Sequence, residues 1–227
     1  MHSPSFHAND VKNFHDKFGL TTPSQLTMLS YELLEFRKKF FIEKISELMS
    51  ALKNGDIYEA ADACVDIIYI TAGAALLSGI LPDEFEKIVT TYGDHAEHIA
   101  LSTTAKDPNT KHADFILKAW SNTVQELPEI YHQTNVRGDQ ARLFHTFANL
   151  YQYSLLIAGE LDIDAALFDE LWDDVQRANM SKERATDASQ SKRGSSFDVI
   201  KPAGWKPAQT VDIINAAKKR FDPSLEA

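Results

Sequence analysis

Apolar residues recur along most of this chain at intervals of three and four, the spacing that places them on one face of an α-helix. Runs that alternate apolar and polar residues between turn signals, as half-buried strands do, do not stand out in the sequence. The pattern therefore predicts an all-α protein, built as an antiparallel bundle of amphipathic helices.

Helix start and stop residues divide the first part of the chain into four predicted helices. Asp10 and Asp56 are good N-cap residues, and Gly19 and Gly55 are typical helix ends. Thr22, followed by a proline, indicates a capping box with proline at the first helical position. The predicted helices cover residues 10–18, 23–54, 56–77 and 82–89.

A polar segment in the middle of the chain, residues 102–110, contains one proline and predicts a linker. The three helices predicted after it, near residues 114–127, 140–158 and 164–179, suggest a weak internal repeat. A shift that superimposes Glu126 on Glu43 also places Asn149 on Asp66. Any two antiparallel bundles can be slid into such a register, so a tandem duplication giving a fused pseudo-dimer and a coincidence both stay open.

These boundaries predict four regions. Residues 1–101 form an N-terminal helical half with a metal-binding helix pair, 102–110 the linker, 111–182 a degenerate second helical half, and 183–227 a C-terminal arm. The arm is polar and irregular, ends in a short helix over residues 210–221, and is expected to lie over a site.

Composition and charge narrow the function classes. With 33 acidic and 23 basic side chains the net charge is −10, which argues against binding of a nucleic-acid polymer. The single cysteine, Cys64, excludes a disulfide within the chain and fits the cytoplasm. No signal peptide is recognisable, and the longest apolar stretch, residues 67–81, is too short for a membrane span and predicts a buried helix.

Two pairs of carboxylates carry the candidate chemistry. Glu43 and Glu47 lie four apart on one predicted helix, and Asp62 and Asp66 four apart on the next, so each pair shares a helix face. Because the turn between these helices is tight, all four carboxylates can converge. Acidic residues more often lie on solvated faces, but the two aspartates stand in an apolar stretch where an unpaired acid is costly. Hard oxygen ligands without histidine or thiolate favour Mg²⁺ or Mn²⁺.

Four stretches resemble, in family order, the MazG-like nucleotide pyrophosphohydrolases, in the branch named after phosphoribosyl-ATP pyrophosphohydrolase. The carboxylate helix pair resembles the family's metal-binding helices. The other three stretches are Phe14-His15-Asp16-Lys17-Phe18-Gly19 at the first helix, Asn179-Met180-Ser181-Lys182 at a later helix end, and Lys201-Pro202-Ala203-Gly204-Trp205 in the tail.

The resemblance implies Mg²⁺-dependent hydrolysis of a (deoxy)nucleoside triphosphate to the monophosphate and pyrophosphate, by an enzyme that assembles as a homodimer. It implies that Mg²⁺, or Mn²⁺ in its place, is held by Glu43, Glu47, Asp62 and Asp66, with Glu43 or Glu47 as the catalytic carboxylate that orients or deprotonates water. It also implies that the nucleotide is bound by Asn179, Lys182, Lys201 and Trp205. A helix-capping role for Lys182 and a packing role for Trp205 remain open.

Two departures from the family pattern support an alternative. Lys44 stands where the family often has a glutamate, and Ala63 occupies another such position. Ligands of a multi-magnesium site are thereby lost, so a non-catalytic helical module that binds a nucleotide or a partner, an inactive paralogue, is the second hypothesis.

Overall fold

The computed structural model describes residues 1–93 and 110–221, so the predicted linker lies outside the described residues except for its last position, Thr110. The helices are α1 (Pro4–Phe18), α2 (Tyr31–Asn54), α3 (Ile57–Leu77), α4 (Pro82–Tyr92), α6 (Thr110–Arg137), α7 (Gln140–Glu160), α8 (Ala165–Met180) and α9 (Thr210–Phe221). Two short strands, β1 (Glu183–Arg184) and β2 (Val199–Ile200), pair antiparallel, and a 3₁₀ turn spans Ala188–Gln190. The all-α prediction is confirmed.

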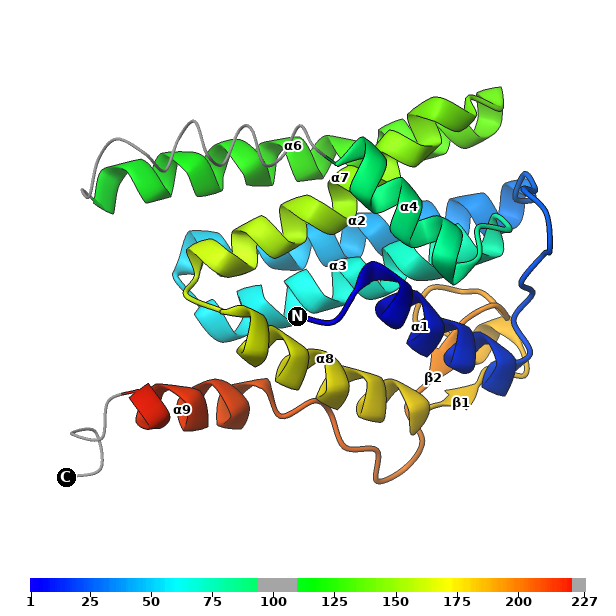
Figure 1. The fold of residues 1–227 in the computed structure, drawn as a ribbon. Coiled ribbons are helices and arrows are strands. Elements are labelled where there is room, and N and C mark those ends of the chain that lie inside the picture. The colour runs from blue at the N-terminus through cyan, green and yellow to red at the C-terminus, as the bar shows by residue number, and fades with distance from the viewer. Residues whose placement is uncertain (94–109, 222–227) are drawn as a thin grey trace.

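Helix α3 is the centre of the bundle. It packs against α1, α2, α7, α8 and α9, and Figure 1 shows α2, α3 and α7 lying alongside one another through the middle of the molecule. One apolar core runs from Val11 of α1 through Phe147 of α7 to Trp172 of α8. Helices from before residue 94 and after residue 109 therefore share this core, while the division into two halves stays a prediction.

The turn between α2 and α3 follows the residues that predicted it. Gly55 has a left-handed backbone, with φ of 67°, and ends α2. The carboxylate of Asp56 then accepts hydrogen bonds from the backbone N–H groups of Tyr58 and Glu59, both at 3.1 Å, and begins α3. This tight turn makes the two helices antiparallel neighbours and fixes which of their faces meet.

The predicted start of α2 is wrong. The helix begins at Tyr31, with the Ser30 hydroxyl accepting from the N–H of Leu33, whereas residues 20–30 form a loop. The loop packs on the turn after α3, where Thr27 N–H donates to the carbonyl of Ser78 at 2.9 Å. Gly79 approaches this loop so closely that a Cβ would lie 1.9 Å from the carbonyl oxygen of Gln25. This tertiary contact overrides the local capping signal.

Other boundaries also differ from the prediction. Helix α1 begins at Pro4 rather than residue 10, because the Ser3 hydroxyl caps it and proline occupies its first turn. Helix α6 runs from Thr110 to Arg137, well beyond the predicted 114–127, and includes Pro128. Helices α7, α8 and α9 begin within one residue of the predicted positions.

The apolar length of α3 does not exclude a membrane span, contrary to the prediction. At 21 residues it is long and apolar enough, but 89% of its most apolar window is buried inside the bundle. The prediction of a buried helix is therefore confirmed.

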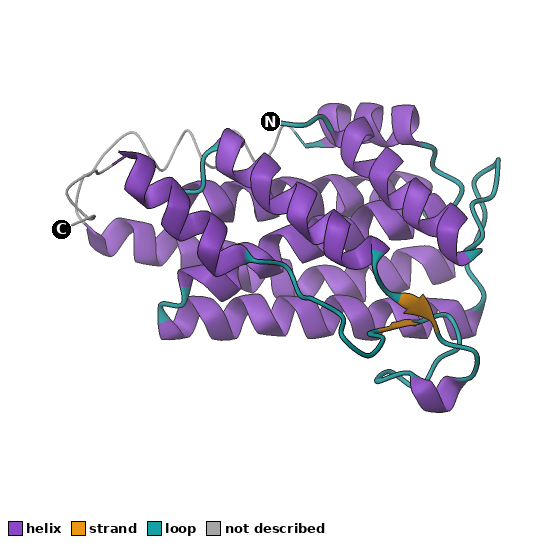
Figure 2. Cartoon of the chain, turned by 90° about the horizontal axis from the view of Figure 1, so that it is seen from below, coloured by secondary structure: helices purple, strands orange, loops and turns teal. Residues whose placement is uncertain are grey.

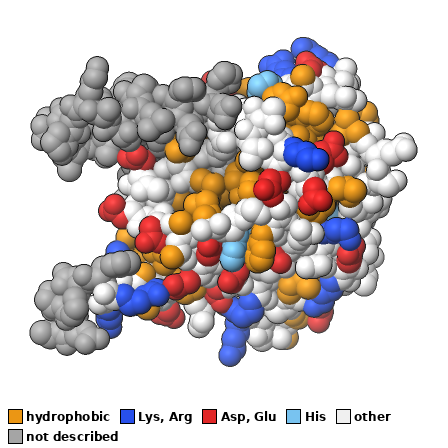
Figure 3. Space-filling view, in the orientation of Figure 1, with side chains coloured by type: hydrophobic (Ala, Val, Ile, Leu, Met, Phe, Trp, Pro, Cys, Tyr) orange, Lys and Arg blue, Asp and Glu red, His pale blue; other side chains and the backbone are white. Residues whose placement is uncertain are grey.

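On the face of the molecule in Figure 3, acidic and basic side chains are interspersed, so the charges there do not gather into one patch.

Candidate active site

A cavity of about 1080 Å³ lies between α2, α3, the end of α8 and the irregular segment 181–209. From here on, the arm means residues 181–209, without helix α9, which the prediction over 183–227 had included. Figure 2 shows the arm, with its two strands, on the outside of the helices. Seven acidic and seven basic side chains line the cavity. Five of the acids come from α2 and α3, and five of the bases from the arm. A carboxylate wall on α2 and α3 therefore faces a basic wall on the arm.

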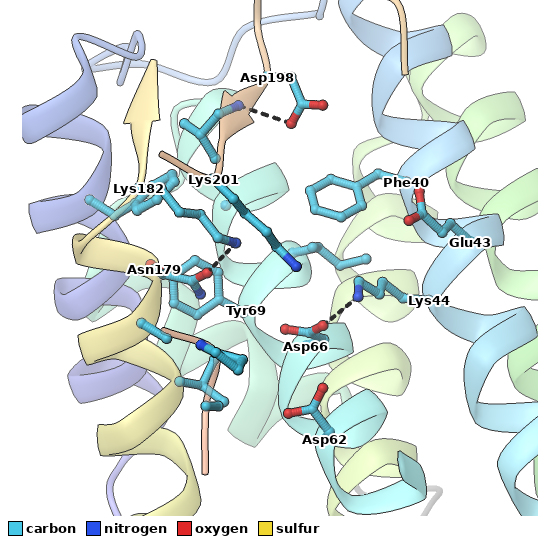
Figure 4. A pocket seen from close by; sticks show the side chains of 18 of the residues that line it. Phe40, Glu43, Lys44, Asp62, Asp66, Tyr69, Asn179, Lys182, Asp198 and Lys201 are labelled. Atoms are coloured by element: carbon cyan, nitrogen blue, oxygen red, sulfur yellow. Dashed lines mark hydrogen bonds and ion pairs between the residues drawn. The ribbon is translucent and has the colours of Figure 1, made fainter. Parts of the chain in front are cut away.

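All eight residues predicted for the site line this one cavity. Four lie on the carboxylate wall and four on the opposite side: Glu43, Glu47, Asp62, Asp66, Asn179, Lys182, Lys201 and Trp205. Figure 4 shows Asp62, Asp66 and Lys44 on one side of the opening and Asn179, Lys182 and Lys201 on the other. The structure thus brings together segments more than a hundred residues apart in sequence.

Lys44 occupies the middle of the carboxylate wall. Its Nζ lies 2.6 Å from Oδ2 of Asp66 and 2.8 Å from Oε2 of Glu47, so it joins α2 to α3. Burial disfavours the charged ammonium, but the two carboxylates outweigh burial and raise the pKa of Lys44. Lys44 is therefore a cation at neutral pH, placed among the carboxylates.

Glu43 is held by the arm. Its carboxylate accepts from Nε of Arg193 at 2.8 Å and from Nη2 at 3.1 Å, a bidentate pairing. Nη1 of Arg193 lies 3.0 Å from Oδ2 of Asp198, and its guanidinium stacks 3.9 Å from the ring centroid of Phe40. Arg193 is thus fixed from three sides.

Asp62 is the one carboxylate of the four without an ion pair among the described residues. It accepts a hydrogen bond from the hydroxyl of Thr210 at 3.0 Å. Burial and the neighbouring charge of Asp66 raise the pKa of Asp62 to about 6. Negative charge is thus least compensated at the Asp62 end of the wall.

The predicted metal ligands share a cavity, yet they do not close around a common point. Within residues 1–93 and 110–221 no three His, Cys, Asp or Glu side chains form a group that could hold a metal ion. The physical reason is that Lys44 and Arg193 engage three of the four carboxylates. The donor set still fits a hard divalent cation, because it consists of carboxylate oxygens. The Lys44 ammonium, in contact with two of these carboxylates, shows that the wall attracts positive charge. Metal binding stays a prediction.

The side opposite the carboxylates combines an amide, two lysines and an indole. Nζ of Lys182 donates to Oδ1 of Asn179 at 2.6 Å, and burial lowers the pKa of Lys182. The ammonium groups of Lys182 and Lys201 lie 5.7 Å and 4.2 Å from the ring centroid of Trp205. The indole N–H of Trp205 donates to the carbonyl of Ala178 at 2.9 Å. Trp205 therefore ties the arm to α8 and also positions two cations.

Sequence reasoning missed several cavity residues. Arg37 lines the cavity, is buried beside Gly73, and donates to the carbonyl of Ile70. Arg37 lies three residues after Leu34 and four before Phe41, both of which are buried. This helical spacing could have indicated a charged side chain on the buried face of α2. Arg193, Asp198 and Thr210 were missed because they stand in, or just after, the irregular arm, where only the adjacent bases Lys192-Arg193 gave a hint.

The carboxylate wall lies within the part of the chain that known proteins resemble. Residues 11–92, from within α1 to the end of α4, match the model of the phosphoribosyl-ATP pyrophosphohydrolase family. The uncharacterized protein L479 of Acanthamoeba polyphaga mimivirus is 24% identical over 155 residues, which cover 66% of this chain and 59% of that protein. The chain thus spans less than two thirds of that relative's length. No solved structure matches the chain.

The match includes all four predicted carboxylates and leaves out α8 and the arm. The sequence resemblance is thereby confirmed for the part of the chain that forms the carboxylate wall. Residues 11–92 thus resemble the phosphoribosyl-ATP pyrophosphohydrolase family, one of the MazG-like nucleotide pyrophosphohydrolases.

Proposed function

We propose that the chain hydrolyses a (deoxy)nucleoside triphosphate to the monophosphate and pyrophosphate with Mg²⁺, for which Mn²⁺ can substitute. The family of residues 11–92 points to a nucleotide pyrophosphohydrolase in general. The observation that carries the finer proposal is the pair of opposed walls, carboxylates from α2 and α3 and cations from the arm, across one cavity. A polyphosphate with its cation matches both walls at once.

The chain's own residues suit in-line attack at the α-phosphorus. Lys182 and Lys201 supply charge to the phosphates, and Asn179 holds Lys182 in place. Glu47, with 43% of its side chain exposed at the cavity, can orient a water and accept its proton. As the water oxygen bonds to the α-phosphorus, the bond to the bridging oxygen breaks and pyrophosphate leaves with that oxygen. A divalent cation held by Asp62 and Asp66 would neutralise adjacent phosphates and lower the pKa of a bound water.

The basic wall also suggests how the substrate is oriented. Trp205 presents an aromatic ring beside two lysines, so a base can stack there while the phosphates reach across to the carboxylate wall.

Assembly as a homodimer and a cytoplasmic location are part of the proposal. The proposed partners are the nucleotide and a second copy of the chain, and they include no nucleic-acid polymer and no membrane.

Product identification tests the proposal. Each common ribonucleoside and deoxyribonucleoside triphosphate is incubated with the full chain and Mg²⁺, and both products are identified by chromatography. We expect the monophosphate and pyrophosphate in equal amounts, and no products with excess chelator. Orthophosphate as the first product would assign a different phosphohydrolase.

The non-catalytic alternative has one specific observation in its favour, the engagement of three carboxylates by Lys44 and Arg193. Nucleotide binding in the same panel without any turnover would establish that alternative.

A further inference from the structure

The charges around Lys44 are unusual for a site that is expected to collect cations from solution. Its side chain is 16% exposed, and its ammonium is in hydrogen-bond contact with a carboxylate from each of two helices. Asp66, one of these partners, is itself 20% exposed. The ammonium thus takes a position between Glu47 and Asp66 that a divalent ion bound by both would need.

A purely structural role explains this arrangement poorly. The α2–α3 pair is already joined by a tight turn and by apolar contacts along both helices. Buried ion pairs contribute little net stability, because desolvation offsets much of the attraction. The pairing is better explained by the need to compensate carboxylates that would otherwise repel one another across the two helices.

The remaining charges show where compensation is incomplete. Glu43 is paired with Arg193, and Glu47 and Asp66 share Lys44, whereas Asp62 receives only the Thr210 hydroxyl. Lys192 is a further cation 3.5 Å from Glu43, so the ion pairs gather at the Glu43, Glu47 and Asp66 carboxylates. The Asp62 end of the wall is where a divalent ion would meet the least competing positive charge.

We propose that Lys44 is a built-in cation of the site, which takes the place of a second divalent ion, so that the chain holds a single divalent ion beside Asp62 and Asp66. This proposal rests on the proposed function, since it concerns the same carboxylate wall. It gives Lys44 a positive role where the sequence suggested a lost ligand. Lys44 acts through Glu47 and Asp66, so it is a positioning residue rather than a catalytic one.

The test counts metal ions and measures no turnover. Mn²⁺ is titrated into the full chain without nucleotide, and free Mn²⁺ is followed by electron paramagnetic resonance. We expect one Mn²⁺ per chain for the unchanged protein and for Lys44→Arg, which keeps the charge. Lys44→Glu should bind two, because it replaces the ammonium by a further oxygen ligand. Lys39→Glu, exposed on the same helix, is the matched control and should bind one.

A second variant keeps the proposal testable if Lys44→Glu does not fold. Lys44→Gln removes the ammonium without adding a ligand, and should increase Mn²⁺ affinity at least tenfold because Glu47 and Asp66 lose their fixed cation. Two or more ions in the unchanged protein, an unchanged count in folded Lys44→Glu, or unchanged affinity in Lys44→Gln would overturn the proposal. If the ion count responds as expected but no triphosphate is hydrolysed, the proposed function fails and the role of Lys44 stands.

Discussion

Two regions of this bundle bury polar side chains in opposite ways. In the aromatic core, formed by His7, Tyr69, Tyr151, Phe168 and Trp172, buried His7 has neutral partners: its Nδ1 lies 2.7 Å from the hydroxyl of Tyr151, and its ring is 4.0 Å from that of Trp172. A carboxylate, that of Asp10, enters this core only as the acceptor of the Trp172 indole N–H. In the cavity, the partners are ions held in pairs, within the carboxylate wall for Lys44 and Asp66 and between that wall and the arm for Glu43 and Arg193. The two regions meet at Tyr69, which packs on Trp172 and lines the cavity.

This difference indicates that the aromatic core contributes mainly to stability and the cavity mainly to function. A neutral hydrogen bond inside an apolar cluster avoids most of the cost of desolvating a charge. Ion pairs in a cavity add little stability, but they keep charges in position for an ionic ligand. We therefore expect changes in the cavity to alter turnover more than folding, and changes in the aromatic core to do the reverse.

The strongest test of this separation is Asp66→Asn. The change keeps the shape of the side chain and removes a charge that the proposed divalent cation would need, so turnover should fall by about 1000-fold or more, roughly 4 kcal/mol. The melting temperature should change little, because relief of the repulsion between Asp66 and Asp62 offsets the loss of the ion pair with Lys44, which keeps Glu47 as a partner. Product formation and thermal unfolding of the same preparation measure both effects.

The control for this change is Asp162→Asn, at an exposed position with φ of 59° that asparagine also tolerates. It should leave both measurements unchanged. Full activity in Asp66→Asn would remove the carboxylate wall from the mechanism, and unfolding of that variant would show that the cavity and the core are not separable.

Lys182→Ala should have a smaller effect, confined to substrate use. Loss of one ammonium near the phosphates is expected to lower kcat/KM by about 10- to 100-fold, which corresponds to roughly 1.4–2.7 kcal/mol. Mn²⁺ affinity should stay the same, since Lys182 bonds Asn179 and none of the four carboxylates. Lys219→Ala, exposed on α9, serves as the control. A matching loss of Mn²⁺ affinity would mean that the two walls do not act separately.

The carboxylate wall was readable from the sequence because helix geometry is local. Asp56 caps α3 as its residue type predicts, and the four-residue spacing then places Asp62 and Asp66 on one face without further information. The start and end predicted for α9 also coincide with the structure, and the carboxylates and the tail residues meet in one cavity.

The positions of the arm residues could not be predicted in this way. Its positions depend on contacts with residues far along the chain, such as Arg193 with Glu43 and Trp205 with the carbonyl of Ala178. The loop at 20–30 was misread for the same reason, since its hydrogen bond to Ser78 is tertiary. Lys44 was correctly noted as a departure, but a missing ligand and an inserted cation look the same until its ammonium is placed.

The smallest predicted effect concerns the aromatic core and should spare the cavity. Burial, with a further contribution from His2, lowers the pKa of His7 to about 3, against an ordinary value near 6.5. The unfolded chain therefore binds a proton at His7 between these values while the folded chain does not. Stability contributed by neutral His7 is fully present above pH 6.5 and is lost progressively as the pH falls from 6.5 toward 3. Between pH 6 and pH 5 the loss should be about 1 kcal/mol for this one residue.

Urea unfolding of the unchanged chain and of His7→Gln measures this loss, with pH 8 as the reference at which the imidazole is neutral in both states. His7→Gln should be less stable at pH 8, because the contacts of the imidazole with Tyr151 and Trp172 are lost, but its stability should fall less steeply between pH 6 and pH 5. Equal slopes in the two proteins would show that His7 takes up its proton in the folded state as readily as in the unfolded state, and that burial does not keep the imidazole neutral. Loss of hydrolysis at pH 8 in folded His7→Gln would show instead that the core and the cavity are coupled, and Tyr69, which contacts Trp172 and lines the cavity, is the residue through which that coupling would pass.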